Sequence, residues 1–266
     1  SLNIPNGYYD GVDGLSGEPL KAMLNSIIND HQEYPYTHNT QTDLWDILRH
    51  ADEDPNNPDH IIGIYTGLSI AKDCQDTINP PAFCEIEAYG EMKLVEWNRE
   101  HVWSKSRGDF SDENHTAHND AHHLVAAERV MNSIKNNRFF EDCHDGDDDN
   151  IVDRGYGNFT CNLWSFEPRD EVKGDIARMI FYMVVRYEDA SFDLEAINDP
   201  EQYRDTNLPY YGDIDDLLRW HILDPVSEDE VRRNDIIFSY QGNRNPFIDL
   251  PELVALIWGS PEDYSE

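Results

Sequence analysis

Positive charge is scarce in this sequence of 266 residues. Twenty Lys and Arg residues face fifty-four Asp and Glu residues, only six of the twenty are Lys, and the formal net charge is −34. A Lys-poor acidic surface suits very salty water, because the Debye length falls to about 3 Å at 1 M salt and self-repulsion is screened. We therefore expect a salt-adapted protein, with an ordinary acidic soluble protein as the alternative.

Long apolar runs are also missing. No segment reaches the roughly eighteen consecutive apolar residues that a membrane-spanning helix needs, so we expect no membrane segment. The first residues, SLNIPNGYYDG, lack the basic and apolar regions of a signal peptide, and we expect a mature secreted chain from which one was removed. Neither an internal repeat nor a linker is evident, and the sequence predicts one domain over residues 1–266.

Cysteine is limited to four residues, and neither local pair has the C-x-x-C spacing of a zinc site. Cys74 and Cys84 bracket one short loop, and Cys143 and Cys161 bracket another. We expect two local disulfides, each worth ~2–3 kcal/mol, as in secreted proteins. Four reduced, unrelated thiols are the alternative.

Periodic apolar residues predict helices at both ends of the chain and a little strand between them. We expect helices beginning at Ser16 and over 42–50, 171–187, 213–222, 227–240 and 250–258, a buried strand over 61–67, and an extended segment over 93–104. This pattern indicates an α+β fold.

One segment carries residues suited to metal-assisted chemistry. Glu100 and His101 are adjacent on the extended segment, so their side chains leave on opposite faces unless the strand twists or ends there. Asn132 lies on a short helix predicted over 131–137, where Asn136 shares its face. A carboxylate and an amide oxygen are hard ligands that suit Mg²⁺, Mn²⁺ or Ca²⁺ better than zinc.

The charge of this segment differs from that of the whole chain. Residues 99–138 contain six basic and six acidic residues and five of the eleven His, so the segment is locally neutral. An anionic partner would be repelled by the rest of this acidic chain, so its binding would require a segment with balanced charge such as this one. Without this context, Glu100 and His101 would be interpreted as an ordinary surface pair.

Several segments resemble a known family. WNREHVWSKS, DAHHL and VMNSIKNN resemble the endonuclease I family of secreted and periplasmic nucleases, members of the ββα-metal (His-Me finger) superfamily. YYDG, DEDPNNPDHIIGIYTG, WSFEPRDEVKGDIARMIFYMVVRYED and QGNRNPFIDLPELVALIWG are similar to the Bacillus-type extracellular ribonucleases of that family, so the resemblance covers nearly the whole chain. It implies an α+β fold with a ββα-metal finger over about 95–140 and a small central sheet flanked by helices.

The resemblance also implies roles for individual residues. His101 would be the general base that deprotonates water, and Glu100 and Asn132 would bind a single Mg²⁺. An arginine would hold the phosphate; Arg107 is the first candidate, with Arg99 and Arg178 behind it. The residues expected to orient the finger and support the ligands are Asp120, His122, His123, Lys135, Asn136 and Asn137.

Two motifs depart from the family pattern. The Arg-Pro that commonly follows the HHL or HNL triplet is Val125-Ala126 here, and Asn-x-x-Arg-Gly-Asn becomes Asn132-Ser-Ile-Lys135-Asn136-Asn137. The ligand position is retained, but Lys is a poorer bidentate partner than Arg for phosphate or carboxylate. These departures affect the residues around the expected ligands, and the expected ligands Glu100 and Asn132 are retained.

Other metal sites receive less support. The acidic loop 144–150 is interpreted as solvated, with Ca²⁺ binding as the alternative, and the H-x-x-x-H spacing of His118 and His122 lacks an obvious third zinc ligand.

The sequence predicts a secreted, salt-tolerant, monomeric endonuclease that hydrolyses DNA and RNA with little sequence specificity and leaves a 5′-phosphate. A catalytically weak or inactive binding protein with the nuclease fold, and a zinc hydrolase, are the alternatives.

Overall fold

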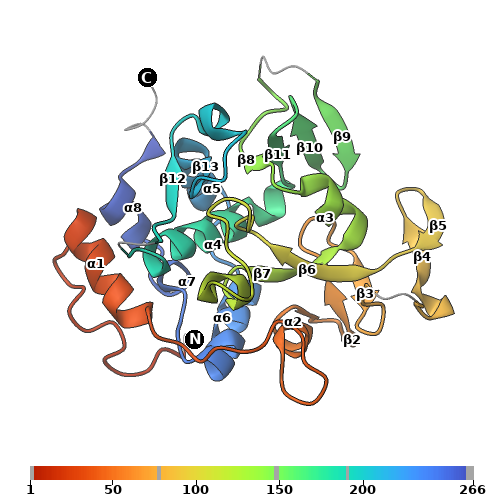
Figure 1. Cartoon of the computed structure of the whole chain (residues 1–266), viewed down its shortest axis with the longest axis horizontal. Helices are drawn as coiled ribbons and strands as arrows, with labels where there is room; N and C mark the ends of the chain where they lie inside the picture. Colours follow the sequence, from red (N-terminus) through yellow and green to blue (C-terminus); the bar gives the residue numbers. More distant parts are fainter. Residues whose placement is uncertain (1–2, 77–78, 147–149, 190–191, 262–266) are drawn as a thin grey trace.

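The computed structural model describes residues 3–76, 79–146, 150–189 and 192–261 (Figure 1). Its α-helices are α1 (Gly17–Ile28), α2 (Leu44–Ala51), α3 (Arg129–Lys135), α4 (Lys173–Arg186), α5 (Ile214–Leu223), α6 (Glu228–Gln241), α7 (Pro246–Asp249) and α8 (Leu253–Trp258). Short 3₁₀ helices are η1 (Ala82–Cys84), η2 (Thr116–Asn119), η3 (Asp170–Val172) and η4 (Pro200–Tyr203).

The strands are short and fall into five small sheets. In chain order they are β1 (Glu53–Asp54), β2 (Asn57–Ile62), β3 (Ser69–Ala71), β4 (Glu85–Ala88), β5 (Glu91–Leu94), β6 (Trp97–His101), β7 (Leu124–Glu128), β8 (Phe139–Phe140), β9 (Val152–Gly155), β10 (Asn158–Cys161), β11 (Ser165–Glu167), β12 (Glu195–Ile197) and β13 (Tyr210–Asp213). The sheets are β1-β2-β3, β4-β5, β6-β7, β8-β11-β10-β9 and β12-β13.

The antiparallel pair β6–β7 crosses the middle of the molecule and separates two hydrophobic cores (Figure 1). Because side chains alternate along a strand, Val125 and Ala127 of β7 enter the larger core and Leu124 and Ala126 enter the smaller one. Every residue of β7 is buried. The pair is therefore held in place by packing on both faces.

Helix α4 runs through the larger core. Its residues from Ile176 to Val185 are all buried, so the protein packs around the whole helix and not only along its apolar face. Helices α1, α5 and α7 pack against it. The smaller core lies between α2, α6 and the outer face of β6–β7.

Both predicted disulfides are confirmed: Cys74 pairs with Cys84, and Cys143 pairs with Cys161. The acidic loop predicted over 144–150 lies partly outside the described residues, which omit 147–149. None of the helices in the described part has the length and apolar character needed to cross a membrane.

The α+β class and the ββα order of β6, β7 and α3 agree with the prediction, but several boundaries differ. The strand expected over 61–67 is β2, which begins at Asn57 and ends at Ile62. The helix expected over 131–137 is α3, which begins and ends two residues earlier. Asn136 lies past its end with a φ of 48°, so it does not share a helical face with Asn132 as predicted.

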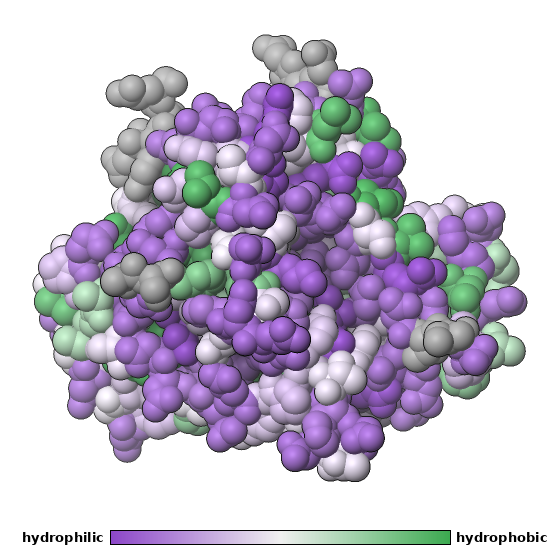
Figure 2. Space-filling model, viewed as in Figure 1, coloured by the Kyte–Doolittle hydropathy of each residue, from purple (hydrophilic) through white to green (hydrophobic). Residues whose placement is uncertain are grey.

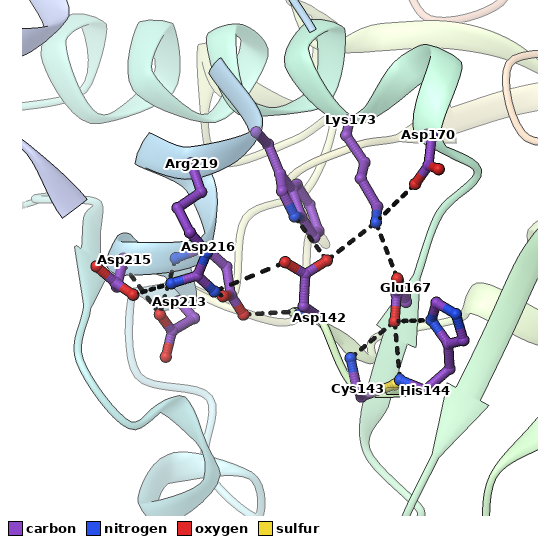
Figure 3. Close-up of polar contacts among 11 residues, drawn as sticks. Asp142, Cys143, His144, Glu167, Asp170, Lys173, Asp213, Asp215, Asp216 and Arg219 are labelled. Atoms are coloured by element: carbon purple, nitrogen blue, oxygen red, sulfur yellow. Dashed lines mark hydrogen bonds and ion pairs between the residues drawn. The ribbon is translucent and has the colours of Figure 1, made fainter. Parts of the chain in front are cut away.

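A dense polar network surrounds the second disulfide (Figure 3). The Lys173 ammonium lies 2.8 Å from Glu167 Oε1 and 3.0 Å from Asp142 Oδ1, and it also contacts Asp170. Glu167 Oε2 accepts hydrogen bonds from the backbone N–H groups of Cys143 and His144. We call this group, together with Arg219 and its partners Asp215 and Asp216, the Lys173 network.

Candidate active site

The ββα unit brings α3 against one face of β6. Glu128, the last residue of β7, caps α3 by accepting hydrogen bonds from the backbone N–H groups of Val130 and Met131. Asn132 Nδ2 then donates to Asn98 Oδ1 of β6 at 2.7 Å. Asn98 and Glu100 lie two residues apart and so share this face of the strand. Asn132 and Glu100 therefore belong to the same side of the β6–β7 pair.

Glu100 is buried, with only 4% of its surface exposed. Its Oε2 accepts a hydrogen bond from the Tyr65 hydroxyl at 2.6 Å and lies 3.6 Å from the Lys135 ammonium. Burial raises the pKa of Glu100, and the Lys135 charge and the Tyr65 hydrogen bond act in the opposite direction. Its Oε1 has no hydrogen-bond partner among the described residues, which leaves one carboxylate oxygen available to a ligand.

His101 ends β6 on the opposite face from Glu100, as the alternation of side chains predicts. Its Nε2 lies 2.9 Å from the backbone oxygen of His118. A carbonyl oxygen can only accept, so Nε2 carries the proton and Nδ1 has the free lone pair. No described residue forms a hydrogen bond with Nδ1. Burial, and then the neighbouring rings of His123 and His118, hold the pKa of His101 well below its usual value.

These features fit a hard metal ion and a neutral base. The oxygens without a protein partner among the described residues are Oε1 of Glu100 and Oδ1 of Asn132, and oxygen donors of this kind suit Mg²⁺ with retained waters. No cluster of three or more His, Cys, Asp or Glu side chains that could hold a metal occurs in the described part of the chain. A site made from one carboxylate, one amide and water does not require such a cluster.

Asp120 anchors the loop between β6 and β7 to distant helices. It is fully buried, and its Oδ2 accepts hydrogen bonds from the hydroxyls of Tyr182 and Tyr187 at 2.7 and 2.8 Å. Its Oδ1 accepts one from Gln241 at the end of α6. Burial alone would raise the pKa of Asp120, but the surrounding histidines, led by His31, lower it. Asp120 thus ties the loop to α4 and α6 without contacting Glu100.

His122 and His123 also have separate structural partners. His122 Nε2 donates to the backbone oxygen of Asn243, and His123 Nε2 donates to that of Ala117. His123 Nδ1 accepts a hydrogen bond from the backbone N–H of Trp103. With both nitrogens engaged, the His123 ring supports the segment that follows His101.

Of the residues expected to support the ligands, Lys135 contacts Glu100 directly. It is fully buried, and its ammonium donates to the backbone oxygen of Val102 and the hydroxyl of Ser104 besides facing Glu100. Where the family resemblance implies an arginine, this chain has a lysine whose ammonium lies next to the Glu100 carboxylate. Asn136 and Asn137 are exposed, and their backbone oxygens accept hydrogen bonds from Ser104 and Arg107 respectively.

Arg107, predicted to hold the phosphate, lies in a different setting. Its side chain is buried, and its guanidinium donates to the backbone oxygens of Asn137, Tyr203, Arg204 and Thr206. These contacts give Arg107 the role of joining two loops, so we no longer propose it as the phosphate ligand. Arg178 is likewise buried against Glu230, and Arg99 lies between the rings of Tyr36 and Trp45.

Three residues of the site were not predicted: Tyr65, Asn98 and Tyr36. Tyr65 lies within the strand predicted over 61–67 but beyond the end of β2, and it donates to Glu100. Asn98 orients the amide of Asn132, and the Tyr36 ring stacks on His101 at 5.7 Å between centroids. Asn98 could have been found from its i, i+2 spacing to Glu100. Tyr36 and Tyr65 carry no local sequence signal because tertiary folding brings them to the site.

Comparison with known proteins gives a consistent result. The sequence model of Endonuclease I matches residues 16–252. The chain is 40% identical over 254 residues to the extracellular ribonuclease of Bacillus subtilis (strain 168) and 41% identical over 254 residues to that of Bacillus amyloliquefaciens. Each alignment covers 94% of this chain and 78% of the relative.

Proposed function

Because the chain belongs to the endonuclease I family, we propose that it is a secreted, metal-dependent endonuclease that hydrolyses phosphodiester bonds of DNA and RNA with little sequence specificity. The observation that carries the proposal is the arrangement around β6. A carboxylate and an amide, each with a free oxygen, lie on one face, and a neutral imidazole with a free Nδ1 ends the strand. The relatives named extracellular ribonucleases and the two disulfides support secretion.

In this proposal each residue has a defined task. Glu100 and Asn132 would hold one Mg²⁺, and the chemistry such an ion would supply is Lewis-acid stabilisation of the phosphate and of the leaving 3′-oxygen. His101 accepts the proton of the attacking water at Nδ1, while the His118 carbonyl fixes the ring through Nε2. Tyr65 and Lys135 hold Glu100 in place, and Asn98 orients the Asn132 amide. The bond between phosphorus and the 3′-oxygen breaks, so one product ends in a 3′-hydroxyl and the other carries a 5′-phosphate.

The charge of the chain implies salt tolerance. At a formal charge of −34, long-range repulsion of a polyanion is strong in dilute buffer and is screened within about 3 Å at 1 M salt. We expect the cleavage rate to be maximal well above ordinary salt. A rate that is highest at low NaCl and falls steadily from there would contradict this part of the proposal.

Plasmid DNA and a long RNA incubated with the protein and Mg²⁺ test the function directly. The wild type should degrade both, EDTA should stop it, and His101→Ala should lower the rate by about 10²–10⁴. His50→Ala, which removes an exposed histidine, is the matched control and should cut normally. Intact substrates with the wild type would favour a non-catalytic binding protein, and undiminished cutting by His101→Ala would mean that another group is the base.

A further inference from the structure

An open polar pocket lies at the start of α2 and has a volume of about 580 Å³. Its lining consists of residues 37–43, three residues of α2 and Gln75, and we call it the α2 pocket. Pockets of this size hold small organic ligands. The lining does not include Glu100, His101 or Asn132, so the α2 pocket is separate from the candidate active site.

A row of stacked side chains connects the α2 pocket to the candidate active site. Arg99 and His101 lie on the same face of β6, two residues or about 7 Å apart. The Tyr36 ring stacks on His101, and Arg99 Cζ lies 3.5 Å from the centre of that ring. Arg99 Cζ also lies 4.0 Å from the centre of the Trp45 ring, which lines the pocket. Three ring contacts thus lead from the proposed base to the wall of the α2 pocket.

Hydrogen bonds within the protein fix the walls of the α2 pocket. The Arg99 guanidinium donates to the Thr37 hydroxyl at 3.1 Å, at the beginning of the loop. At its end, the Asp43 carboxylate accepts hydrogen bonds from the backbone N–H groups of His38 and Asp46, which closes the loop and caps α2. Because both ends of the loop are tied down, a ligand would have to order little of the pocket when it binds.

Three amide side chains of the lining have unused hydrogen-bonding capacity. Those of Asn39 and Gln41 are exposed and form no hydrogen bond among the described residues. The Gln75 oxygen accepts from Arg49 Nε at 2.7 Å, while its two N–H groups have no partner in the described part of the chain. An amide presents an acceptor and two donors side by side, which is the pattern that pairs with the edges of nucleobases.

The charges of the α2 pocket favour an uncharged ligand over a phosphate. Asp43 and Asp46 line it, and Arg49 is the one Lys or Arg among the described residues of the lining. The Arg49 guanidinium already donates to Gln75 and lies 3.9 Å from the Asp73 carboxylate. The N-terminus of α2 is occupied by the capping carboxylate of Asp43. A phosphate would therefore be repelled here, whereas a nucleobase would not.

The α2 pocket lies beside the central hollow of the molecule. The face shown in Figure 2 is mostly hydrophilic and is hollowed near its centre, where β6 and α3 lie in Figure 1. Helix α2 and the loop before it lie directly below β6 in Figure 1, and α2 contacts β7. A strand that crosses the hollow can therefore place one of its bases in the α2 pocket.

We propose that the α2 pocket binds one unpaired nucleobase of the strand that is cut. The base stacks against the Trp45 ring, as bases stack on aromatic side chains in other single-strand sites. The amides of Asn39, Gln41 and Gln75 hydrogen-bond its edge. Because each amide can present a donor or an acceptor, the pocket accepts any base and adds affinity with little sequence specificity. This proposal rests on the proposed function for its ligand, but it concerns binding and can be tested without cleavage.

Fluorescence anisotropy in EDTA measures binding to two labelled strands of equal length, an oligothymidylate and a strand of abasic residues. The two strands carry the same phosphates, so the difference in affinity measures the contribution of the bases. The wild type should bind the oligothymidylate about tenfold more tightly than the abasic strand. Asn39→Ala/Gln41→Ala should bind the oligothymidylate about fivefold more weakly than the wild type and the abasic strand equally well. Both changed side chains are exposed, so the fold should be retained.

The matched control is Asn56→Ala/Gln202→Ala, which removes two exposed amides outside the α2 pocket and should bind both strands as the wild type does. Equal affinity of the double variant and the control for the oligothymidylate would overturn the proposal. An equal loss for both strands would also overturn it, because the loop would then contact phosphates. If the wild type leaves plasmid DNA intact with Mg²⁺ while the double variant loses affinity for the oligothymidylate alone, the proposed function fails and the base site stands.

Discussion

The Lys173 network and the region around Lys135 use positive charge in opposite ways. Lys173 contacts three carboxylates, those of Asp142, Glu167 and Asp170, and Arg219 nearby contacts further aspartates (Figure 3). Lys135 faces a single carboxylate, that of Glu100, and Arg138, three residues further on, has no carboxylate within ion-pair distance among the described residues. The first region holds several carboxylates with its cations, and the second places one buried cation beside the single carboxylate of the candidate site.

A strongly acidic chain can bind a polyanion where its local charge is balanced. Net charge describes the long-range field, whereas binding depends on the local balance over a few ångströms once salt screens that field. The carboxylates beside the second disulfide are neutralised internally by Lys173 and Arg219. Removing a cation should therefore have an effect that depends on the region from which it is taken.

Lys135→Met should have the largest effect because it leaves Glu100 buried without its cation. We expect the free energy of unfolding to fall by about 3–5 kcal/mol, the cost of breaking a buried ion pair from one side. Urea denaturation at neutral pH measures it. A loss below about 1 kcal/mol would mean that Glu100 is protonated or solvated and that the region is not built around this pair.

Acid should weaken the Lys173 network as the pH falls from about 4.5 toward 2. Burial opposes ionisation of Glu167, but hydrogen bonds from Cys143, Lys173 and His144 lower its pKa to about 2. A lowered pKa contributes stability that is present above the ordinary value near 4.5 and is lost as the pH falls toward 2. The contribution is at most about 3 kcal/mol, taken from the size of the shift.

Denaturation of wild type and Glu167→Gln between pH 6 and pH 2 measures this contribution. The variant should be less stable at pH 6, and its stability should fall less steeply below the ordinary pKa. Glu87→Gln, which changes an exposed carboxylate, is the control and should follow the wild type. Parallel curves for wild type and Glu167→Gln would show that the network does not hold this carboxylate ionised.

Lys173→Met should destabilise the protein by about 2 kcal/mol without changing the cleavage site. The loss is smaller than for Lys135 because the Lys173 ammonium is partly solvated and Arg219 remains to neutralise Asp142. Hydrolysis of bis(4-nitrophenyl) phosphate should stay within about twofold of wild type. If Lys173→Met instead abolished hydrolysis at full stability, the division between a structural and a ligand-binding region would be wrong.

Arg232→Gln should have the smallest effect, below about 0.5 kcal/mol. Its ion pair with Asp229 spans 3.8 Å at the surface, where water and salt screen it. Thermal unfolding at low and high NaCl should give nearly the same difference from wild type. A loss as large as that of Lys173→Met would mean that the number of cations, rather than their placement, sets stability in this chain.

The parts of this structure that the sequence predicted are those with local causes. Helices α4, α5 and α6 follow from apolar periodicity and caps such as Ser227, whose side chain accepts from Glu230 in a capping box. The disulfides follow from short loops that bring their cysteines together. Glu100 and Asn132 were proposed as neighbours from a resemblance, and the packing of α3 on β6 places them on the same face.

The parts that the sequence did not predict depend on distant contacts. The sheet that includes β8 and β11 consists of strands of two to four residues, too short for a recognisable alternation. Arg107 was the first candidate for the phosphate-holding arginine that the resemblance implies, yet most of its partners come from 203–206, nearly a hundred residues away. Asp120 likewise depends on tyrosines of α4 and its C-terminal end. Local patterns identify candidate groups, but only packing decides which cations and carboxylates remain free.

Metal binding tests the central claim most directly. Calorimetric titration of the metal-free protein with Mn²⁺ or Mg²⁺ should give one site per chain, and Glu100→Gln should weaken it at least tenfold while near-ultraviolet circular dichroism shows an intact fold. Asn132→Ala should weaken the same site to a smaller extent. Unchanged affinity in folded Glu100→Gln would contradict the account, because the free carboxylate oxygen on β6 would then not be the metal ligand.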